Sequence, residues 1–232
     1  MIFSGKPTLG WYMHEVGSQL FTYGYLLIPT VLVFTVFGYR LGRLADKLNQ
    51  REAELERLNI VLENQSITDD LTGLFNHRHI LVQVNKEVER SRRYHRRLSG
   101  MMVDIDDFKS VNDLYGHLTG DSVIREMAEL INRCVRNVDI VGRFGGDEFL
   151  VILPEADTQA AAIVSNRVLT EIRKHPFKIG RDTIELTASI GVFTVTDPKD
   201  FDKLSFVDRI DQAMFTAKER GKNLIYVAKD AA

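Results

Sequence analysis

A stretch without charged residues near the N-terminus limits what this chain can fold into. From Leu20 to Tyr39 the sequence contains no Asp, Glu, Lys or Arg. A helix of that length, rising about 1.5 Å per residue, spans roughly the 30 Å hydrocarbon core of a bilayer. A buried core helix is the alternative; a cleaved signal peptide is a weaker one, because only Lys6 is basic before the stretch. We therefore predict a transmembrane helix over residues 20–40.

Basic residues follow the predicted span directly and indicate its orientation. They are Arg40, Arg43, Lys47 and Arg51. By the positive-inside rule, the C-terminal side of the span faces the cytoplasm. The sequence thus predicts a single-pass protein of the cytoplasmic membrane. Its residues 1–19 form a short extracytoplasmic N-terminus, too small for a folded sensor domain.

A heptad repeat follows the span over residues 41–66. Charged residues fill most of the positions between the repeating leucines, a pattern typical of a short parallel two-stranded coiled coil. A single amphipathic helix lying on the next domain is the alternative. Direct continuation from the membrane helix favours dimerisation, so we expect a homodimer. The first seam position holds Leu41, Leu48, Leu55 and Leu62, and the second holds Leu44, Arg51, Leu58 and Gln65.

The remaining residues, 67–232, are long enough for one globular domain with a sizeable core. The chain of 232 residues has a formal net charge of −2, so no global charge favours nucleic acid. Its one cysteine, Cys134, excludes an internal disulfide and fits a reducing compartment. We interpret Cys134 as a small buried helix residue rather than a reactive thiol.

Helical and strand-like segments mix along this domain, which predicts an α+β sheet with helices packed on it. We expect the short run Phe177–Ile179 to pair with Ile184–Leu186. Helical periodicity covers Ile80–Arg97, Ser122–Arg136, Thr158–Lys174 and Lys203–Arg220. Strand-like runs cover Gly100–Ile105, Asp139–Phe144, Glu148–Leu153, Ile184–Val195 and Leu224–Val227.

Two acidic clusters stand out within these elements. Gly145 and Gly146 precede Asp147 and Glu148 between two apolar runs, which predicts a β-hairpin with carboxylates at its tip. By itself this pattern also fits a solvated acidic turn. A second carboxylate, Asp104, follows the apolar segment 101–103 at a predicted strand end. We expect the polar residues 112–121 that come next to lie within one helical stretch. If the clusters meet in space, they offer oxygen ligands for Mg²⁺ together with nucleotide phosphates.

At these motifs the chain resembles the GGDEF-domain diguanylate cyclases, a bacterial family. Several spaced motifs occur in the family's order over roughly residues 67–229, which makes the resemblance specific. Asn112 and Asp113, Tyr115 to His117, and Gly120 and Asp121 belong to it. The longer motifs are Asp-Asp-Leu-Thr-Gly-Leu-Phe-Asn at 69–76, Asp-Ile-Asp-Asp-Phe-Lys at 104–109, Arg-Phe-Gly-Gly-Asp-Glu-Phe at 143–149 and Ala-Lys-Glu-Arg-Gly-Lys-Asn at 217–223.

The resemblance implies a ferredoxin-like, nucleotidyl-cyclase-type sheet with the hairpin at its active edge. It also implies condensation of two GTP molecules into cyclic di-GMP with release of two pyrophosphates. One GTP would bind to each subunit of a dimer in the bacterial inner membrane. The metal, Mg²⁺ or Mn²⁺, would be held by Asp104, the Ile105 carbonyl, Asp147 and Glu148. Glu148 has two possible roles, as a metal ligand or in deprotonating the attacking hydroxyl.

The resemblance also implies substrate contacts. Asn112 and Asp121 match the family's guanine-reading positions, and a carboxylate at 121 favours GTP over ATP. His117 lies one turn before Asp121, where a structural role is as plausible as a substrate contact. Phe108 and the glycines 145 and 146 complete the substrate-binding set. Lys109, Lys218 and Lys222 match phosphate partners, with Lys109 also counted as catalytic beside Asp147 and Glu148; the family often has Arg where Lys222 stands.

An Arg-x-x-Asp unit, Arg136 to Asp139, lies at the offset of the family's product-inhibition site. Its two side chains would bind phosphate and guanine of cyclic di-GMP. The basic run Arg90, Arg92, Arg93, Arg96 and Arg97 could touch that ligand, although a solvated helix face is the more usual role. His77 and His79 stand where the family usually has an arginine pair.

Two rival functions fit parts of the same sequence. One is a catalytically inactive GGDEF domain that serves as a cyclic di-GMP receptor or interaction module. The intact carboxylates at 104, 147 and 148 argue against it. The other is a ferredoxin-like RNA-binding module. The absence of a basic bias and of an aromatic RNA-stacking motif argues against that one.

Overall fold

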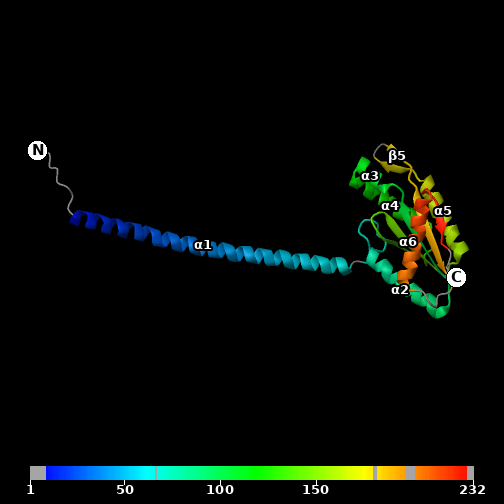
Figure 1. Cartoon of the computed structure of the whole chain (residues 1–232), viewed down its shortest axis with the longest axis horizontal. Coiled ribbons are helices and arrows are strands. Elements are labelled where there is room, and N and C mark those ends of the chain that lie inside the picture. Colours follow the sequence, from blue (N-terminus) through cyan, green and yellow to red (C-terminus); the bar gives the residue numbers. More distant parts are fainter. Residues whose placement is uncertain (1–8, 66, 180–181, 197–201, 229–232) are drawn as a thin grey trace. The chain divides into compact units, whose positions relative to one another are not determined.

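The computed structural model describes residues 9–65, 67–179, 182–196 and 202–228 (Figure 1). The chain divides into two compact units, Met1–Gln65 and Ser66–Ala232. Each unit has its own secondary structure, and the fold of each follows from its own sequence pattern.

The described part of the first unit is one helix, α1 (Leu9–Gln65), of 57 residues. The helix runs without interruption through the predicted span and the predicted coiled coil. It begins at Leu9, so part of the expected N-terminal segment 1–19 is helical. Within the described part of the chain, one stretch, Leu27–Leu55, is long and apolar enough to cross a membrane by length and composition. None of that window is buried within the described residues.

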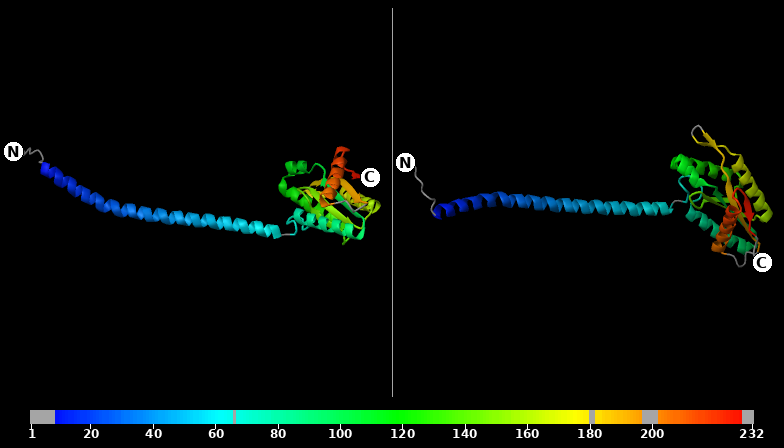
Figure 2. Two further views of the ribbon diagram at one scale, coloured as in Figure 1. Left: turned by 60° about the horizontal axis from the view of Figure 1, so that its bottom comes forward. Right: turned by 45° about the horizontal axis from the view of Figure 1, so that its top comes forward.

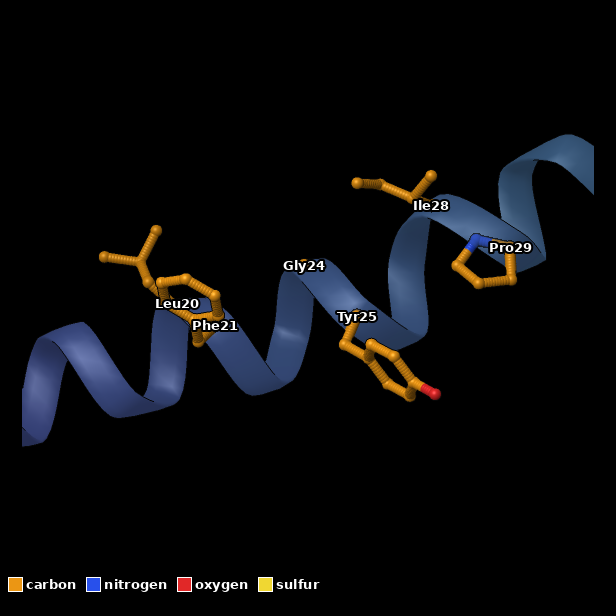
Figure 3. A pocket seen from close by; sticks show the side chains of 6 residues that line it. All are labelled: Leu20, Phe21, Gly24, Tyr25, Ile28 and Pro29. Carbon is orange, nitrogen blue, oxygen red and sulfur yellow. The ribbon is translucent and has the colours of Figure 1, made fainter.

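The apolar side chains of α1 form rows along the helix. Leu20, Gly24 and Ile28 repeat every four residues, and so do Phe21, Tyr25 and Pro29; together they line a shallow apolar pocket (Figure 3). Pro29 lies inside the helix, where it lacks an N–H donor. Membrane helices tolerate such a residue, so Pro29 is compatible with the predicted span.

The heptad leucines are on the surface of α1. Leu41, Leu44, Leu48 and Leu55 are each at least half exposed. The side chains at the last heptad positions, 58, 62 and 65, lie outside the described residues. An exposed row of leucines is what an unpaired coiled-coil strand presents, but the single chain does not test the pairing, which stays a prediction.

The second unit is built on a five-stranded mixed sheet with the order β2-β3-β1-β6-β7. Strand β1 is central and antiparallel to both neighbours, whereas β6 and β7 are parallel. The prediction of an α+β fold is confirmed. The strands are β1 (Leu98–Ile105), β2 (Ile140–Arg143), β3 (Glu148–Pro154), β6 (Ala188–Val195) and β7 (Ile225–Val227).

Helices cover both faces of this sheet (Figure 2). Alternate side chains of the buried strands pack on opposite layers, as the two-residue period of a strand requires. One apolar cluster includes α4 (His117–Arg133) and α5 (Thr158–Lys174), and the other includes α2 (His77–Tyr94) and α6 (Lys203–Glu219). Cys134 is buried at the end of α4, as predicted, and burial raises the pKa of its thiol.

The structure corrects two expected elements. Residues 112–121 are not one helical stretch: α3 (Phe108–Tyr115) and α4 are separated at Gly116, whose φ of 83° is in the left-handed region. The expected strand 184–195 is also divided. Its first residue belongs to β5 (Asp182–Ile184), which pairs with β4 (Phe177–Ile179) in a separate two-stranded sheet. The partner of β4 is therefore shifted toward the turn from the predicted 184–186.

Candidate active site

The two acidic clusters meet at one end of the central strands. In the antiparallel register of β1 and β3, Asp104 lies directly across from Glu148. The Ile105 N–H donates to the Asp147 carbonyl oxygen at 3.3 Å, one step further along. The predicted proximity of Asp104 to the hairpin acids is confirmed, and it follows from pairing of the buried strands rather than from the acids themselves.

The hairpin turn is closed by backbone hydrogen bonds. The N–H groups of Phe144 and Gly145 both donate to the Glu148 carbonyl oxygen, at 2.8 and 3.2 Å. A Cβ on Gly145 would approach Glu148 Oε2 to 2.4 Å, so a side chain there would displace that carboxylate. A Cβ on Gly146 would meet no protein atom within 4 Å. The fold therefore needs no glycine at 146, and its backbone is open to a ligand.

Arg143 ties this turn to the first loop of the domain. Its guanidinium donates to the Gly146 carbonyl oxygen at 2.7 and 3.2 Å and to both Asp69 carboxylate oxygens at 3.2–3.3 Å. Asp69 also accepts from the Thr72 N–H and hydroxyl. Sequence reasoning quoted both charged residues in motifs but gave them no role. Their separation of 74 residues leaves no local signal for the pair.

Asp104 is the most buried charged group of the site, with a side chain only 4 % exposed. Burial raises the pKa of its carboxyl from 3.8 to about 6, although the hydrogen bond and charge of Lys218 oppose the shift. Lys218 Nζ donates to Asp104 Oδ2 at 2.6 Å from the last turn of α6. Burial and the neighbouring Asp147 also raise the pKa of the Glu148 carboxyl. Burial, reinforced by nearby negative charge, thus disfavours the ionised forms of Asp104 and Glu148.

The donor set suits a hard divalent cation. Among the described residues, no three carboxylate, imidazole or thiol groups converge on one point. Mg²⁺ commonly takes only one or two protein carboxylates and keeps water or phosphate as its other ligands. A buried carboxylate at 104, with two further acids beside it, satisfies that smaller requirement, and a cation would relieve their mutual repulsion.

The loop after α6 meets the loop after β1 through a row of polar contacts. Lys222 Nζ donates to Asp107 Oδ1 at 2.6 Å, and the Asn223 N–H donates to Asp106 Oδ2 at 2.9 Å. Asp106 is 5 % exposed and also accepts from the hydroxyls of Thr187 and Ser189, both at 2.6 Å. This structural role of Asp106 was not predicted from the sequence. The only local indication is that Asp106 stands two residues after Asp104, the spacing of side chains on one face of a strand.

The predicted base-reading residues lie on α3 and α4. A Cβ on Gly120 would approach Asn112 Oδ1 to 1.9 Å, so the glycine lets the Asn112 side chain rest on the α4 backbone beside Asp121. Phe108 is buried below them, Asp121 is half-buried and His117 is exposed. Lys109 is exposed in the first turn of α3 and has no ion pair within the described residues.

The Arg136–Asp139 unit lies at the opposite end of β2 from the two glycines. Asp139 Oδ2 accepts from the Arg136 backbone N–H at 2.7 Å, which makes the unit a tight turn. The Arg136 side chain is exposed and has no ion pair within the described part of the chain. The turn therefore leaves one free guanidinium, while the carboxylate partly caps the backbone.

The two remaining departures from the family pattern are structural. The His77 ring packs on Phe144 and the His79 ring on Phe75, both with centroids 4.7 Å apart.

Arginines of the basic run form surface ion pairs, as expected for a solvated face. Arg90 and Arg96 lie 3.6 and 3.7 Å from Glu155, and Arg97 lies 3.1 Å from Asp157.

Carboxylates at the end of a central strand lie beside an open glycine turn and lysines, a set of groups that suits a divalent cation and phosphates. Comparison with known proteins assigns the family. A family model described as "Diguanylate cyclase, GGDEF domain" matches residues 66–224. The chain belongs to the GGDEF family.

Curated relatives extend the comparison. Diguanylate cyclase DgcP of Pseudomonas aeruginosa is 33 % identical over 192 residues, which is 82 % of this chain and 28 % of that protein. Response regulator PleD of Caulobacter vibrioides is 35 % identical over 162 residues, which is 69 % of this chain and 36 % of that protein. The chain thus spans about a third of the length of these relatives.

Solved structures share the fold. Diguanylate cyclase SiaD from Pseudomonas aeruginosa, in complex with its activator SiaC, matches with a TM-score of 0.67 and 31 % identity, covering 94 % of this chain and 84 % of that chain. The coiled coil and GGDEF domain of DgcB from Caulobacter crescentus, in complex with c-di-GMP, matches with a TM-score of 0.67 and 28 % identity. That match covers 80 % of this chain and 99 % of that chain.

Proposed function

We propose that this chain is a membrane-anchored diguanylate cyclase. It condenses two GTP molecules into cyclic di-GMP with release of two pyrophosphates, and each subunit of a homodimer holds one GTP. The observation that carries the proposal is the pairing of buried Asp104 with Glu148 beside the open Gly146 turn. Family membership and the curated diguanylate cyclases support the reaction.

Asp104, Asp147, Glu148 and the Ile105 carbonyl would hold Mg²⁺, or Mn²⁺ in its place. The cation would neutralise negative charge on the phosphates while the 3′-oxygen attacks and pyrophosphate leaves. The chain's own acids supply the negative field that attracts the cation, and burial together with their mutual repulsion raises the pKa of the Asp104 and Glu148 carboxyls. Glu148, with its raised pKa, is placed either to complete this set or to receive the hydroxyl proton.

The substrate contacts are assigned by position around the two loops. The open backbone at Gly145 and Gly146 admits the phosphates. Lys109, Lys218 and Lys222 balance triphosphate charge, and Lys218 and Lys222 exchange a carboxylate for a phosphate partner when GTP binds. Asn112 and Asp121 bind the guanine edge above Phe108, with His117 at the rim.

Dimerisation follows from the symmetry of the product. A two-fold symmetric product made from two bound GTP molecules requires two sites facing each other, as in a C2 dimer. The exposed heptad leucines of α1 offer the seam for a parallel coiled coil. Such a seam raises the effective concentration of the two catalytic domains, and a change in its packing would align or separate them.

The charge-free stretch of α1 anchors the enzyme in the bacterial inner membrane as a single-pass protein. The arginines and lysine after it place the catalytic domain in the cytoplasm, where GTP is found. Cyclic di-GMP is also proposed as an inhibitor at the Arg136–Asp139 turn, with the free Arg136 guanidinium gripping a phosphate. No nucleic-acid partner is proposed.

One assay tests the reaction. The purified full chain in detergent is incubated with GTP and Mg²⁺, and products are separated by chromatography. Cyclic di-GMP from the wild type, with none from Asp147→Ala or Glu148→Ala, is the expected result. Binding of cyclic di-GMP without synthesis would support the inactive receptor instead. Non-competitive product inhibition is tested with Arg136→Ala, and inhibition equal to that of the wild type would exclude the proposed site.

A further inference from the structure

We propose that Arg173 and Asp106 are positioning residues that clamp the loop after α6 and thereby place Lys218 and Lys222. The inference rests on the proposed function, because it concerns the two lysines assigned to the triphosphate. Neither residue is among the site residues predicted from the sequence, and Arg173 lies on α5, outside the family motifs.

The loop has an unusual backbone. Gly221, Lys222 and Asn223 follow one another with φ values of 113°, 62° and 51°, all in the left-handed region. Residues with a side chain rarely adopt this conformation, and a run of them persists only where surrounding contacts fix it. The loop therefore requires an external clamp.

Asp106 supplies the clamp from below. Its buried carboxylate accepts the Asn223 N–H at 2.9 Å and the hydroxyls of Thr187 and Ser189 at 2.6 Å. The three donors come from β6, from the residue directly before it and from the loop, and all of them bind one carboxylate that is 5 % exposed. Because Asp106 is buried and accepts three hydrogen bonds from the protein, it holds the loop against the end of β1 rather than facing substrate.

Arg173 supplies the clamp from the side. Its Nε donates to Asn223 Oδ1 at 2.6 Å, and its Nη2 donates to the Asn223 carbonyl oxygen. The planar guanidinium thus holds the side chain and the backbone of one left-handed residue at once, which a lysine cannot do in the same geometry. The contact joins residues 50 positions apart and ties the loop to α5.

The held loop determines where both lysines point. The Gly221 N–H donates to the Lys218 carbonyl oxygen at 3.3 Å, and the Lys222 N–H to that of Ala217 at 3.2 Å, so the loop folds back on the last turn of α6. From there the ammonium groups reach Asp104 and Asp107, each at 2.6 Å. Loss of the clamp frees Lys222 more than Lys218, whose Cα stays on the helix.

The test compares Arg173→Ala with Arg167→Ala in the full chain in detergent. Arg167 lies on the same helix and donates to the Cys134 carbonyl oxygen, so it is a matched arginine that does not touch the loop. Hydrogen exchange of residues 221–223 and binding of two probes are measured. The probes are guanosine and a GTP analogue with a methylene bridge between the α- and β-phosphates, which cannot react at that bond.

We expect Arg173→Ala to speed hydrogen exchange of the loop by about 10-fold and to weaken binding of the GTP analogue by a similar factor. Binding of guanosine should be unchanged. Arg173→Lys should fall between, and Asp106→Asn should follow Arg173→Ala. Arg167→Ala should leave the loop and the ratio of the two affinities unchanged. Unchanged loop exchange in Arg173→Ala would overturn the clamp, and faster exchange with an unchanged affinity ratio would overturn the positioning role. If the wild-type chain binds neither probe, the proposed function fails, and exchange alone decides the clamp.

Discussion

Lys218 Nζ lies 2.6 Å from Asp104 Oδ2, so a cation from α6 meets the most buried carboxylate of the site. The contact joins residues 114 positions apart and shows which charge the fold places against the end of β1. We expect Asp104 to exchange this partner for a metal ion. A divalent cation would offset the repulsion between Asp104 and the two neighbouring acids more strongly than one ammonium group does.

Removal of the Asp104 charge should abolish catalysis without unfolding the domain. Asp104→Asn keeps the shape but loses an anionic ligand, and we expect a loss of activity of at least about 100-fold, since a catalytic metal contributes several kcal/mol. Initial rates over a Mg²⁺ titration measure the effect. Asp113→Asn, which neutralises an exposed acid of α3, is the control and should retain activity. A full rate for Asp104→Asn at moderate Mg²⁺ would contradict the metal assignment.

Burial of Asp104 should also give the metal-free protein a characteristic pH dependence. Its pKa is raised from 3.8 to about 6, so between these values the folded state holds a proton that the unfolded state has lost. The contribution of this group to the free energy of unfolding is fully present below pH 3.8 and is lost as the pH rises to about 6. The total change is at most about 3 kcal/mol. Denaturant unfolding without metal should show this fall, with Asp104→Asn flatter. Mg²⁺ should stabilise increasingly across the same range, because it binds the ionised form.

The two glycines of the turn should respond differently to a methyl group. Gly145→Ala places a Cβ against the flexible end of Glu148, so we expect little loss of stability but a displaced carboxylate and slow turnover. Gly146→Ala should leave the fold and Glu148 in place and raise the KM for GTP. Gly191→Ala is the steric control: its Cβ would lie 2.0 Å from the Met214 backbone nitrogen, so it should destabilise strongly. Wild-type kinetics for Gly146→Ala would argue against phosphate approach at that backbone.

Arg143 should support both the turn and the start of the domain. Arg143→Ala removes hydrogen bonds to the Gly146 carbonyl and to Asp69, and we expect a loss of about 1–3 kcal/mol in the free energy of unfolding. Activity should fall as well, because the turn loses its anchor. Arg125→Ala on the exposed face of α4 serves as a comparison. Unchanged stability together with unchanged kcat would show that the anchor is dispensable.

Deletion of residues 1–65 should make activity depend steeply on protein concentration. The unit Ser66–Ala232 keeps the sheet and all proposed site residues, but it loses the helix that would raise the effective concentration of its partner. We expect the specific activity of the truncated protein to rise with increasing protein concentration. The specific activity of the full chain should not change with concentration. Equal and concentration-independent rates for both proteins would contradict a role of α1 in dimerisation.

The periodic segments were predictable because their signals are local. The helix α5 has the predicted bounds, and the hairpin of β2 and β3 forms where two apolar runs flank the glycines. The break at Gly116 was missed because helical residues continue on both sides of it, and only the φ of one glycine separates α3 from α4. The divided run 184–195 was missed because β-branched residues favour a strand without specifying which sheet it joins.

Periodicity, charge and motif spacing are properties of neighbouring positions, so most of the elements, the candidate membrane span and the residue types of the site were predictable from the sequence. The partners of the charged residues become visible only in the folded chain: Asp104 with Lys218, Arg143 with Asp69, and Arg173 with Asn223. These pairs join positions 50 to 114 residues apart. Their contacts depend on strand register and on helix packing across the sheet, which no local pattern of residues specifies.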